Sequence, residues 1–518
     1  MTTSTFAAPG ALRASAQRSA LRRRLRAVMT FVCLALIWTA QVALAMRPDL
    51  NETAFQDEGL YIFMGHRMIQ HISQGAFLHE HPGAYFSGAP GFYPVMAAIG
   101  DYFGGLPGAR TVSLGFAILA TVGVYGLGNQ LFGRVAGLLG ALAFALCGSV
   151  IYQSHLATID STTLALIALA AWLAVYSTNH DGLLWAPLIS ALLTLAFLAK
   201  YAGAAYAPVV AALAVAVGWQ RLRWTIVRRA AYVLVGGLVM GAFVITLWGH
   251  DLIRGIQTTT ISRTVGIHAT KAHLIGQVIS WAGPWLALAV LGGLFRLRRQ
   301  WMVVVVLLAG SIIGPAQQIR IGESTSLAKH VAFGIIFAAP LVGDLFRRAL
   351  RSRLVLTGPL VVGVIGVLCM HGVYFSGRFL TRWEPDNDLR PVLTTVISAS
   401  PHKAILGEQP SPQRYELRNM VAPSQWNDTF AFSYAGLKGP QAYRKAIDQS
   451  HFGVIYLSLS TPYGRYVHSY LTTHDTPYQL VAKVPRHLRG DVIGDWLIYT
   501  PKAVTPAGQG ELPPWSRP

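Results

Sequence analysis

The chain has 518 residues, of which 53% are hydrophobic and only 12% are charged, and its formal net charge at pH 7 is +20. A soluble protein of this length carries about twice that charged fraction, so the composition excludes a soluble globular protein and indicates a polytopic membrane protein. The arginines stand in short runs between hydrophobic segments, which argues against nucleic-acid binding as the origin of the charge. Cys33, Cys147 and Cys369 lie inside apolar segments and predict neither disulfides nor a metal site.

Eleven segments are apolar over the length of roughly 20 residues that spans a bilayer. Residues 1–26 form a basic tail ending in Arg22-Arg23-Arg24-Leu25-Arg26, which is expected in the cytoplasm. Counting onward places the other arginine-rich runs on that side and the C-terminal region outside. The first span is interpreted as an uncleaved anchor rather than a signal peptide, because its apolar run exceeds a signal core. The expected spans are residues 27–46, 111–131, 135–153, 161–177, 183–199, 203–219, 230–249, 274–294, 301–317, 331–346 and 354–374.

The first outer loop, residues 47–110, contains the acidic pair Asp57-Glu58 in a chain with only 22 acidic residues. Apolar residues after the pair recur at a spacing that predicts an amphipathic surface helix up to Gln74, and a second short helix is expected at about 94–103. One interpretation makes Asp57 a general base at the membrane surface, with Glu58 as its support. The other makes both residues an acidic cap of the surface helix. Sequence position alone favours neither.

Positively charged residues are disfavoured on the outer side of a membrane, so those present there need a reason. Lys200 ends one apolar segment, Lys329-His330 begin another, and Arg263 lies in the loop between two more. Each alone is explained by snorkelling toward lipid headgroups. Because they come from three loops on one side, we expect an anion site for a lipid phosphate, bound through charge-assisted hydrogen bonds.

His155 and Asp160 occupy the short outer turn between the third and fourth spans. A carboxylate at membrane depth is costly unless it is paired, so both residues are candidates for binding a sugar hydroxyl or orienting a cation. Alternatively, Asp160 caps the following helix. Their spacing matches no compact ligand motif, so a divalent metal is the less favoured interpretation. Tyr61 is a candidate for stacking on a sugar ring, although aromatic residues also gather at membrane interfaces without a ligand.

Residues 385–500 differ in character from the spans. Strand-like runs at Lys403–Gly407, Gly453–Leu459, Gln479–Val484 and Trp496–Tyr499 alternate with helical stretches at Leu389–Ser398, Gln441–Gln449 and Arg465–Thr472. This alternation predicts a small extracytoplasmic α/β domain. Residues 501–518 are rich in Pro and Gly and are expected to be disordered.

Several motifs within residues 25–375 together resemble the GT-C superfamily of polyprenyl-phosphate-sugar-dependent glycosyltransferases. The resemblance is greatest to the branch that contains the protein O-mannosyltransferases and the lipid A aminoarabinose transferases. The motifs are Phe55-x-Asp57-Glu58-x-x-Tyr61, Gly88-Ala89-Pro90-x-Phe92-Tyr93-Pro94, Ala109-Arg110, Leu131-Phe132-Gly133, His155-x-x-Thr158-x-Asp160 and Ser326-Leu327-x-Lys329-His330.

This resemblance implies a GT-C-like catalytic region of about eleven transmembrane helices at residues 27–375 in a multi-pass plasma-membrane protein. It implies an inverting transfer of a sugar from a polyprenyl-phosphate carrier to an acceptor hydroxyl on the outer face, with Asp57 as the catalytic base. Lys200, Arg263 and Lys329 become candidates for holding the lipid-linked phosphate. Since the donor is itself a lipid-linked substrate, no cofactor is expected.

The expected partners are this donor, a glycan, lipid or protein acceptor, and membrane lipids. The C-terminal half has no β-trefoil-like repeat, which separates the chain from the eukaryotic mannosyltransferases. Two rival functions remain: a lipid-linked-sugar transporter or flippase, and a non-catalytic membrane scaffold. Transporters usually carry charges at the midplane and two related halves, whereas charges here gather at the outer ends.

Overall fold

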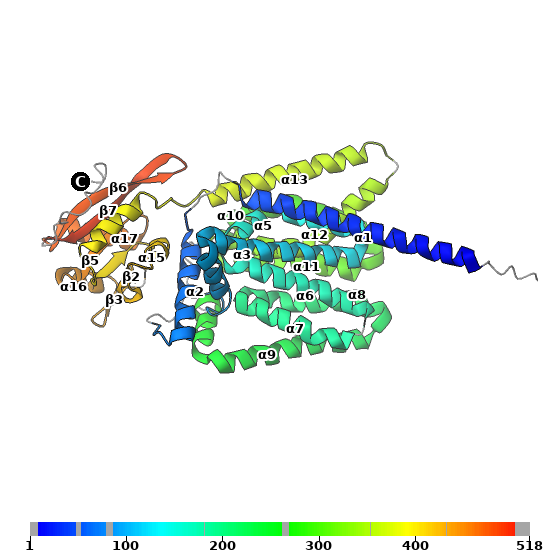
Figure 1. Cartoon of the computed structure of the whole chain (residues 1–518), viewed down its shortest axis with the longest axis horizontal. Helices are drawn as coiled ribbons and strands as arrows, with labels where there is room; N and C mark the ends of the chain where they lie inside the picture. The colour runs from blue at the N-terminus through cyan, green and yellow to red at the C-terminus, as the bar shows by residue number, and fades with distance from the viewer. Residues whose placement is uncertain are drawn as a thin grey trace, which may run out of the picture.

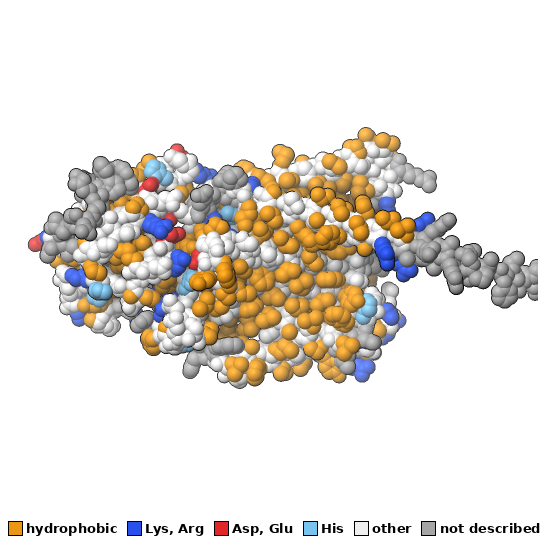
Figure 2. All heavy atoms as spheres, in the orientation of Figure 1, with side chains coloured by type: hydrophobic (Ala, Val, Ile, Leu, Met, Phe, Trp, Pro, Cys, Tyr) orange, Lys and Arg blue, Asp and Glu red, His pale blue; other side chains and the backbone are white. Residues whose placement is uncertain are grey.

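The computed structural model describes residues 9–47, 53–78, 86–180, 182–261, 269–352, 354–430 and 432–502. The chain is a polytopic α-helical membrane protein with a small C-terminal α/β region (Figure 1). Figure 2 shows a hydrophobic belt over the helical part, with Lys and Arg gathered at the end of the belt that lies away from the C-terminal region. The predicted fold class is therefore confirmed.

Each of the eleven predicted spans is helical. Among the described residues, nine helices are long and apolar enough to cross a membrane, and α4 and α5, bent by 66°, make a tenth span if counted together. The remaining predicted span, residues 183–199, corresponds to α7, whose apolar part is shorter. The helices are α1 (Pro9–Ala45), α3 (Tyr93–Phe132), α4 (Arg134–Ala145), α5 (Gly148–His155), α6 (Ile159–Tyr176), α7 (Gly182–Ala199), α8 (Ala207–Leu222), α9 (Trp224–Ile256), α10 (Lys271–Leu294), α11 (Leu297–Ile321), α12 (Leu327–Arg351) and α13 (Thr357–Leu380).

Burial differs sharply among the spans. The apolar window of α12 is 94% buried and that of α6 is 78% buried, whereas the corresponding figures are 11% for α9 and 17% for α1. α6 and α12 therefore form the centre of the bundle, and α1 and α9 face the lipid. Charged side chains on central helices point into protein rather than lipid, which is where intramembrane charges are tolerated.

Short helical turns connect some of these elements. η2 (Ser177–Asn179) follows α6, η3 (Tyr201–Tyr206) joins α7 to α8, and η4 (Gln257–Ile261) extends α9. Lys200 is the single residue between α7 and η3, and its backbone is extended, with φ −151° and ψ 125°. This sharp change of direction turns the lysine away from the line of α7.

The predicted surface helix is present as α2 (Gln56–Gln74). The second short helix is also present, because α3 loses helical geometry at Gly104 and Gly105 and thus consists of a short outer helix followed by a span. Gly105 has φ 61°, a conformation that favours glycine. α2 packs directly on the outer part of α3: a Cβ at Gly65 would lie 1.9 Å from the Pro94 carbonyl oxygen.

The C-terminal region contains a five-stranded sheet of order β2-β1-β5-β7-β6. β1 is parallel to β2 and to β5, while β7 is antiparallel to β5 and β6. The four predicted strands and three predicted helices are all present, and the predicted tail at 501–518 falls almost entirely outside the described residues. The elements are α14 (Leu389–Ser398), β1 (Ala404–Gly407), α15 (Ser411–Glu416), η5 (Pro423–Gln425), β2 (Trp426–Asp428), β3 (Ser433–Tyr434), β4 (Leu437–Lys438), α16 (Pro440–Asp448), β5 (Phe452–Leu457), α17 (Pro462–Thr473), β6 (Tyr478–Leu488) and β7 (Asp491–Pro501).

α15, which the sequence analysis does not anticipate, joins the C-terminal region to the membrane part. A Cβ at Gly59 of α2 would lie 2.5 Å from the Ser411 carbonyl oxygen of α15. Asp101 of α3 accepts hydrogen bonds from Tyr415 (2.5 Å) and Arg418 (2.9 Å). α2 is therefore held between the C-terminal region on one side and the bundle on the other (Figure 1).

Candidate functional site

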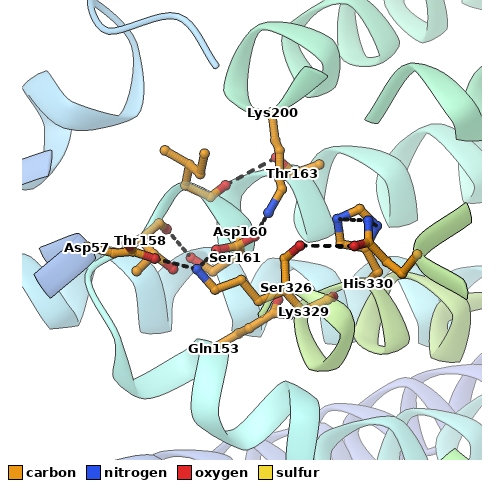
Figure 3. Close-up of polar contacts among 12 residues, drawn as sticks. Asp57, Gln153, Thr158, Asp160, Ser161, Thr163, Lys200, Ser326, Lys329 and His330 are labelled. Carbon is orange, nitrogen blue, oxygen red and sulfur yellow. Dashed lines mark hydrogen bonds and ion pairs between the residues drawn. The ribbon is translucent and has the colours of Figure 1, made fainter. Parts of the chain in front are cut away.

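Four charged side chains from four separate elements form one chain of ion pairs (Figure 3). Lys329 of α12 donates to Asp57 Oδ2 of α2 at 2.7 Å, and its Nζ lies 3.3 Å from Asp160 Oδ2 of α6. Lys200, after α7, donates to Asp160 Oδ1 at 2.5 Å. We call these four residues the ion-pair network. Asp160 thus joins both lysines, and Lys329 joins both carboxylates.

One end of the ion-pair network is buried, and the other end is partly exposed to solvent. The side chain of Asp160 is fully buried, those of Lys329 and Lys200 are 9% and 8% exposed, and that of Asp57 is 35% exposed. Two lysines and two aspartates balance in charge, which removes the large cost of an unpaired buried ion. Asp57 is therefore the member of the network that solvent, and a substrate arriving from solvent, reaches first.

Glu58 points in a different direction from Asp57. Arg110 of α3 donates to both of its carboxylate oxygens, at 2.9 and 2.8 Å, and the backbone N–H groups of Phe55 and Ala157 donate at 2.9 and 2.7 Å. Burial alone raises the pKa of the Glu58 carboxyl, but Arg110 and the two backbone donors outweigh it and hold the pKa below its usual value. Glu58 fastens the start of α2 to α3 and to the α5–α6 turn.

This arrangement separates the two interpretations of the acidic pair. The Phe55–Glu58 contact is the reciprocal half of a helix-capping box, so the capping interpretation applies to Glu58. The Asp57 carboxylate instead points to Lys329. Glu58 supports the position of Asp57 through the helix that they share.

Tyr61 lies one helical turn after Asp57. Its ring packs against Phe86 at 5.2 Å and Tyr93 at 6.5 Å between ring centroids. Burial, then the negative charge of Asp57, raises the pKa of the Tyr61 hydroxyl, and the positive charge of Lys329 opposes this. Tyr61 is a neutral phenol beside the network, with its ring enclosed by other aromatic side chains rather than open for stacking.

Two further predicted residues that the structure describes, His155 and His330, make other contacts. His155 Nδ1 donates to the Ala45 carbonyl oxygen at 2.6 Å and so fixes α5 to the end of α1. The His330 ring contacts Gln318 of α11 and is turned away from the Lys329 ammonium group (Figure 3). Arg263 lies outside the described residues.

All four residues of the ion-pair network are candidate site residues in the sequence, but the sequence does not predict how they pair. The charge asymmetry between the two membrane faces identified both lysines, and the His155–Asp160 turn identified Asp160. Arg110 belongs to one of the sequence motifs, but the motif does not indicate a role for it. The sequence feature that sets it apart is its position, an arginine at the outer end of a span. Within the described residues, no group of three or more His, Cys, Asp or Glu side chains is arranged to hold a metal ion.

A family model described as dolichyl-phosphate-mannose-protein mannosyltransferase matches residues 96–248. These residues include Asp160 and Lys200 but neither Asp57 nor Lys329. No curated protein sequence matches the chain.

Solved structures extend the similarity to almost the whole chain. ArnT from Cupriavidus metallidurans in the apo state aligns with a TM-score of 0.61 at 14% identity, over 94% of this chain and 100% of that one. The chain has the GT-C fold. ArnT bound to undecaprenyl phosphate gives a TM-score of 0.59 at 14% identity, over 93% and 99% of the two chains.

A second GT-C protein is similar over a smaller part of its length. The archaeal oligosaccharyltransferase AglB from Archaeoglobus fulgidus, in complex with an inhibitory peptide and a dolichol-phosphate, aligns with a TM-score of 0.56 at 12% identity. The alignment covers 83% of this chain and 69% of AglB. The resemblance inferred from the motifs is therefore confirmed at the level of fold.

Proposed function

We propose that the chain is a membrane glycosyltransferase that moves a sugar from a polyprenyl-phosphate carrier to an acceptor hydroxyl. The GT-C fold and the mannosyltransferase family match support this class of reaction. The similar structures that contain undecaprenyl phosphate and dolichol-phosphate support a lipid-linked donor. The observation that carries the proposal is the ion-pair network, in which a half-exposed carboxylate meets lysines buried in the bundle.

In this mechanism Asp57 is the general base. It accepts the proton of the acceptor hydroxyl while the acceptor oxygen bonds to the anomeric carbon. The bond from that carbon to the phosphate oxygen breaks, and the polyprenyl phosphate departs with the bonding electron pair. Attack opposite the leaving group inverts the anomeric configuration. Lys329 holds the Asp57 carboxylate in position until the acceptor binds.

Lys200 and Lys329 are proposed to stabilise the departing phosphate. Both lysines are paired with Asp160, which therefore acts as a positioning residue that holds two cations at a fixed separation. A phosphate oxygen approaching either ammonium group competes with a carboxylate already in place. Because Asp160 already holds both ammonium groups in position, they can stabilise the extra negative charge that develops on the leaving group without reorganising during the reaction. Arg263 stays a candidate third cation.

An apolar groove of about 570 Å³ between α7, α8 and α9 suits the polyprenyl chain. Phe197 and Ala204, which flank Lys200 in sequence, are among its lining residues. α9 is only 11% buried over its apolar window, so the groove lies on the lipid-facing side of the bundle. A carrier chain in this groove would bring its phosphate to the buried end of the network.

The proposed orientation places the N-terminal tail in the cytoplasm and the C-terminal region outside, in the plasma membrane. The gathering of Lys and Arg at the opposite end of the belt from the C-terminal region supports this (Figure 2). The acceptor then arrives from the outer aqueous phase, to which the Asp57 side chain is exposed.

The test is Asp57→Asn in the full-length protein, assayed with a polyprenyl-phosphate sugar and envelope glycan acceptors by mass spectrometry. Loss of a general base costs about 10²–10⁴-fold in turnover, so we expect turnover to fall at least about 100-fold. The melting temperature in detergent should fall only slightly, because Asp57 is 35% exposed and Lys329 keeps Asp160 as a partner. Asp475→Asn, at a side chain that is 97% exposed, is the matched control. Full turnover in the Asp57 variant contradicts the assignment of the base.

A further inference from the structure

Tyr152 is a buried tyrosine next to the residues that carry the ion-pair network, because it shares a hydrophobic cluster with Ala328, which precedes Lys329, and with Phe55, which lies two residues before Asp57. The residue lies on α5, is 1% exposed, and its hydroxyl has no hydrogen-bond partner among the residues that the structure describes. The next residue, Gln153, donates a hydrogen bond to the Lys329 backbone carbonyl oxygen at 2.9 Å, which holds this part of α5 against the start of α12. The sequence analysis did not identify it, because a single tyrosine inside an apolar span carries no distinctive pattern.

The ring of Tyr152 is held firmly in place. It packs against Phe379 of α13 at 4.5 Å and Trp281 of α10 at 5.8 Å between ring centroids. Phe379 also contacts Phe55, the residue that precedes α2, at 6.2 Å. The 66° bend between α4 and α5 sets the direction of the helix that carries Tyr152. Three helices therefore fix the phenol at one position beside the network.

Leaving this buried hydroxyl without a partner is unfavourable. A phenylalanine would fill nearly the same space without that penalty. Lys200 and Lys329 already pair with Asp57 or Asp160, so an incoming oxygen must share these ammonium groups with a carboxylate. Tyr152 can donate a hydrogen bond without weakening any ion pair, so it is well placed to meet an oxygen atom of a ligand.

We propose that the Tyr152 hydroxyl donates a hydrogen bond to a phosphate oxygen of the lipid-linked donor, next to Lys329. This inference rests on the proposed function and adds a donor-binding residue to it. An uncharged hydroxyl can donate a hydrogen bond to the phosphate both before and after the sugar is transferred. Tyr152 therefore contributes to the affinity for the lipid-linked sugar and to the affinity for the polyprenyl phosphate product. Asp57, in contrast, acts on the acceptor.

The experiment compares Tyr152→Phe with the full-length wild-type protein. Undecaprenyl phosphate binding is measured by native mass spectrometry, which does not depend on turnover, and KM is measured separately for donor and acceptor. A hydrogen bond to a charged group contributes about 1.5–3 kcal/mol, so we expect undecaprenyl phosphate to bind at least about tenfold more weakly and donor KM to rise similarly. The acceptor KM should stay constant.

Tyr206→Phe is the matched control. Tyr206 is also a buried phenol without a hydrogen-bond partner among the described residues, but its ring packs between Phe333 and Phe337. This variant should bind undecaprenyl phosphate as the wild type does. Both variants should melt at the wild-type temperature or above, because each removes an unpartnered hydroxyl.

Unchanged undecaprenyl phosphate binding in Tyr152→Phe overturns the inference, as does an equal loss in both tyrosine variants. A rise in the acceptor KM alone, with donor binding intact, overturns it as well. Its failure differs from failure of the proposed function, because Asp57→Asn would still abolish transfer. If Asp57→Asn keeps full turnover while Tyr152→Phe weakens undecaprenyl phosphate binding, the assignment of the base fails and the phosphate contact stands.

Discussion

The Lys329 ammonium group lies 2.7 Å from the Asp57 carboxylate, although the two residues are 272 positions apart in the chain. The contact connects the most buried span, α12, to the first turn of the outer helix α2. A base at the membrane surface is therefore tied to the centre of the bundle. Any movement of α2 changes the pairing of Lys329 and, through it, of Asp160.

Lys329→Met tests this connection. The substitution leaves the fully buried Asp160 with Lys200 alone and removes the partner of Asp57. Breaking a buried ion pair by removing one partner costs about 3–5 kcal/mol, so the melting temperature in detergent should fall and turnover should drop at least about 100-fold. Lys438→Met, at an exposed lysine of β4, should change neither.

A double variant separates the stability effect from the catalytic one. In Lys329→Met with Asp160→Asn, the contact between Lys329 and Asp160 is lost only once although each single variant loses it, so the loss of stability should be smaller than the sum of the two single losses. Turnover should stay low, because Lys329 is absent and Lys200 has lost the carboxylate that positions it. Additive stability losses would mean that Lys329 and Asp160 do not interact in the folded protein.

Glu58→Gln should destabilise the protein while leaving Asp57 intact. Arg110 would lose its carboxylate partner, and a buried uncompensated arginine is costly by about 3–5 kcal/mol. Because the pKa of the Glu58 carboxyl is lowered on folding, its contribution to stability is fully present above its ordinary pKa of 4.5 and is lost as the pH falls through the lower folded value. The wild-type advantage over Glu58→Gln, measured by melting temperature, should thus be constant from pH 8 to about 5 and shrink below.

The sequence allowed the spans, α2 and most of the C-terminal strands to be predicted, because each has a local pattern of hydrophobicity. It did not allow the role of Glu58 to be separated from that of Asp57, since neighbouring residues on a helix differ by 100° in direction, and only packing decides which one meets the bundle. α15 has six residues and no apolar periodicity. The pairing of Lys200 with Asp160 depends on how α6 and α7 pack, which a single sequence does not specify.

Asp386, between α13 and α14, should make stability depend on pH in the opposite sense to Glu58. Burial, then the negative charge of Glu416, raises the pKa of the Asp386 carboxyl to about 6. The folded state then binds this proton more tightly than the unfolded state does, so the stabilising effect of protonation is fully present below about 3.8 and is lost as the pH rises through about 6. The wild type should gain about 1–2 kcal/mol between pH 7.5 and pH 5 from this group.

Asp386→Asn isolates this effect, because an amide mimics the protonated carboxyl. The variant should melt above the wild type at pH 7.5, and the difference should shrink toward pH 5. Arg390, which pairs with Glu416 at 2.9 Å, and Tyr456 are other groups near Asp386, and burial raises the pKa of the Tyr456 hydroxyl further above this range. Asp475→Asn, at a side chain that is 97% exposed and pairs with Lys502, should show no such trend.

Gly59→Ala tests whether the C-terminal region helps to position Asp57. The new Cβ would lie 2.5 Å from the Ser411 carbonyl oxygen, so α15 must move away from α2. Hydrogen–deuterium exchange across residues 411–416 should increase, and turnover should fall by up to about 100-fold, because a displacement of about 1 Å at a reacting group is that costly. Gly276→Ala is the matched control, since a Cβ there meets no atom within 4 Å. Faster exchange in α15 with unchanged turnover would show that α2 keeps its position through Glu58 and Arg110 alone.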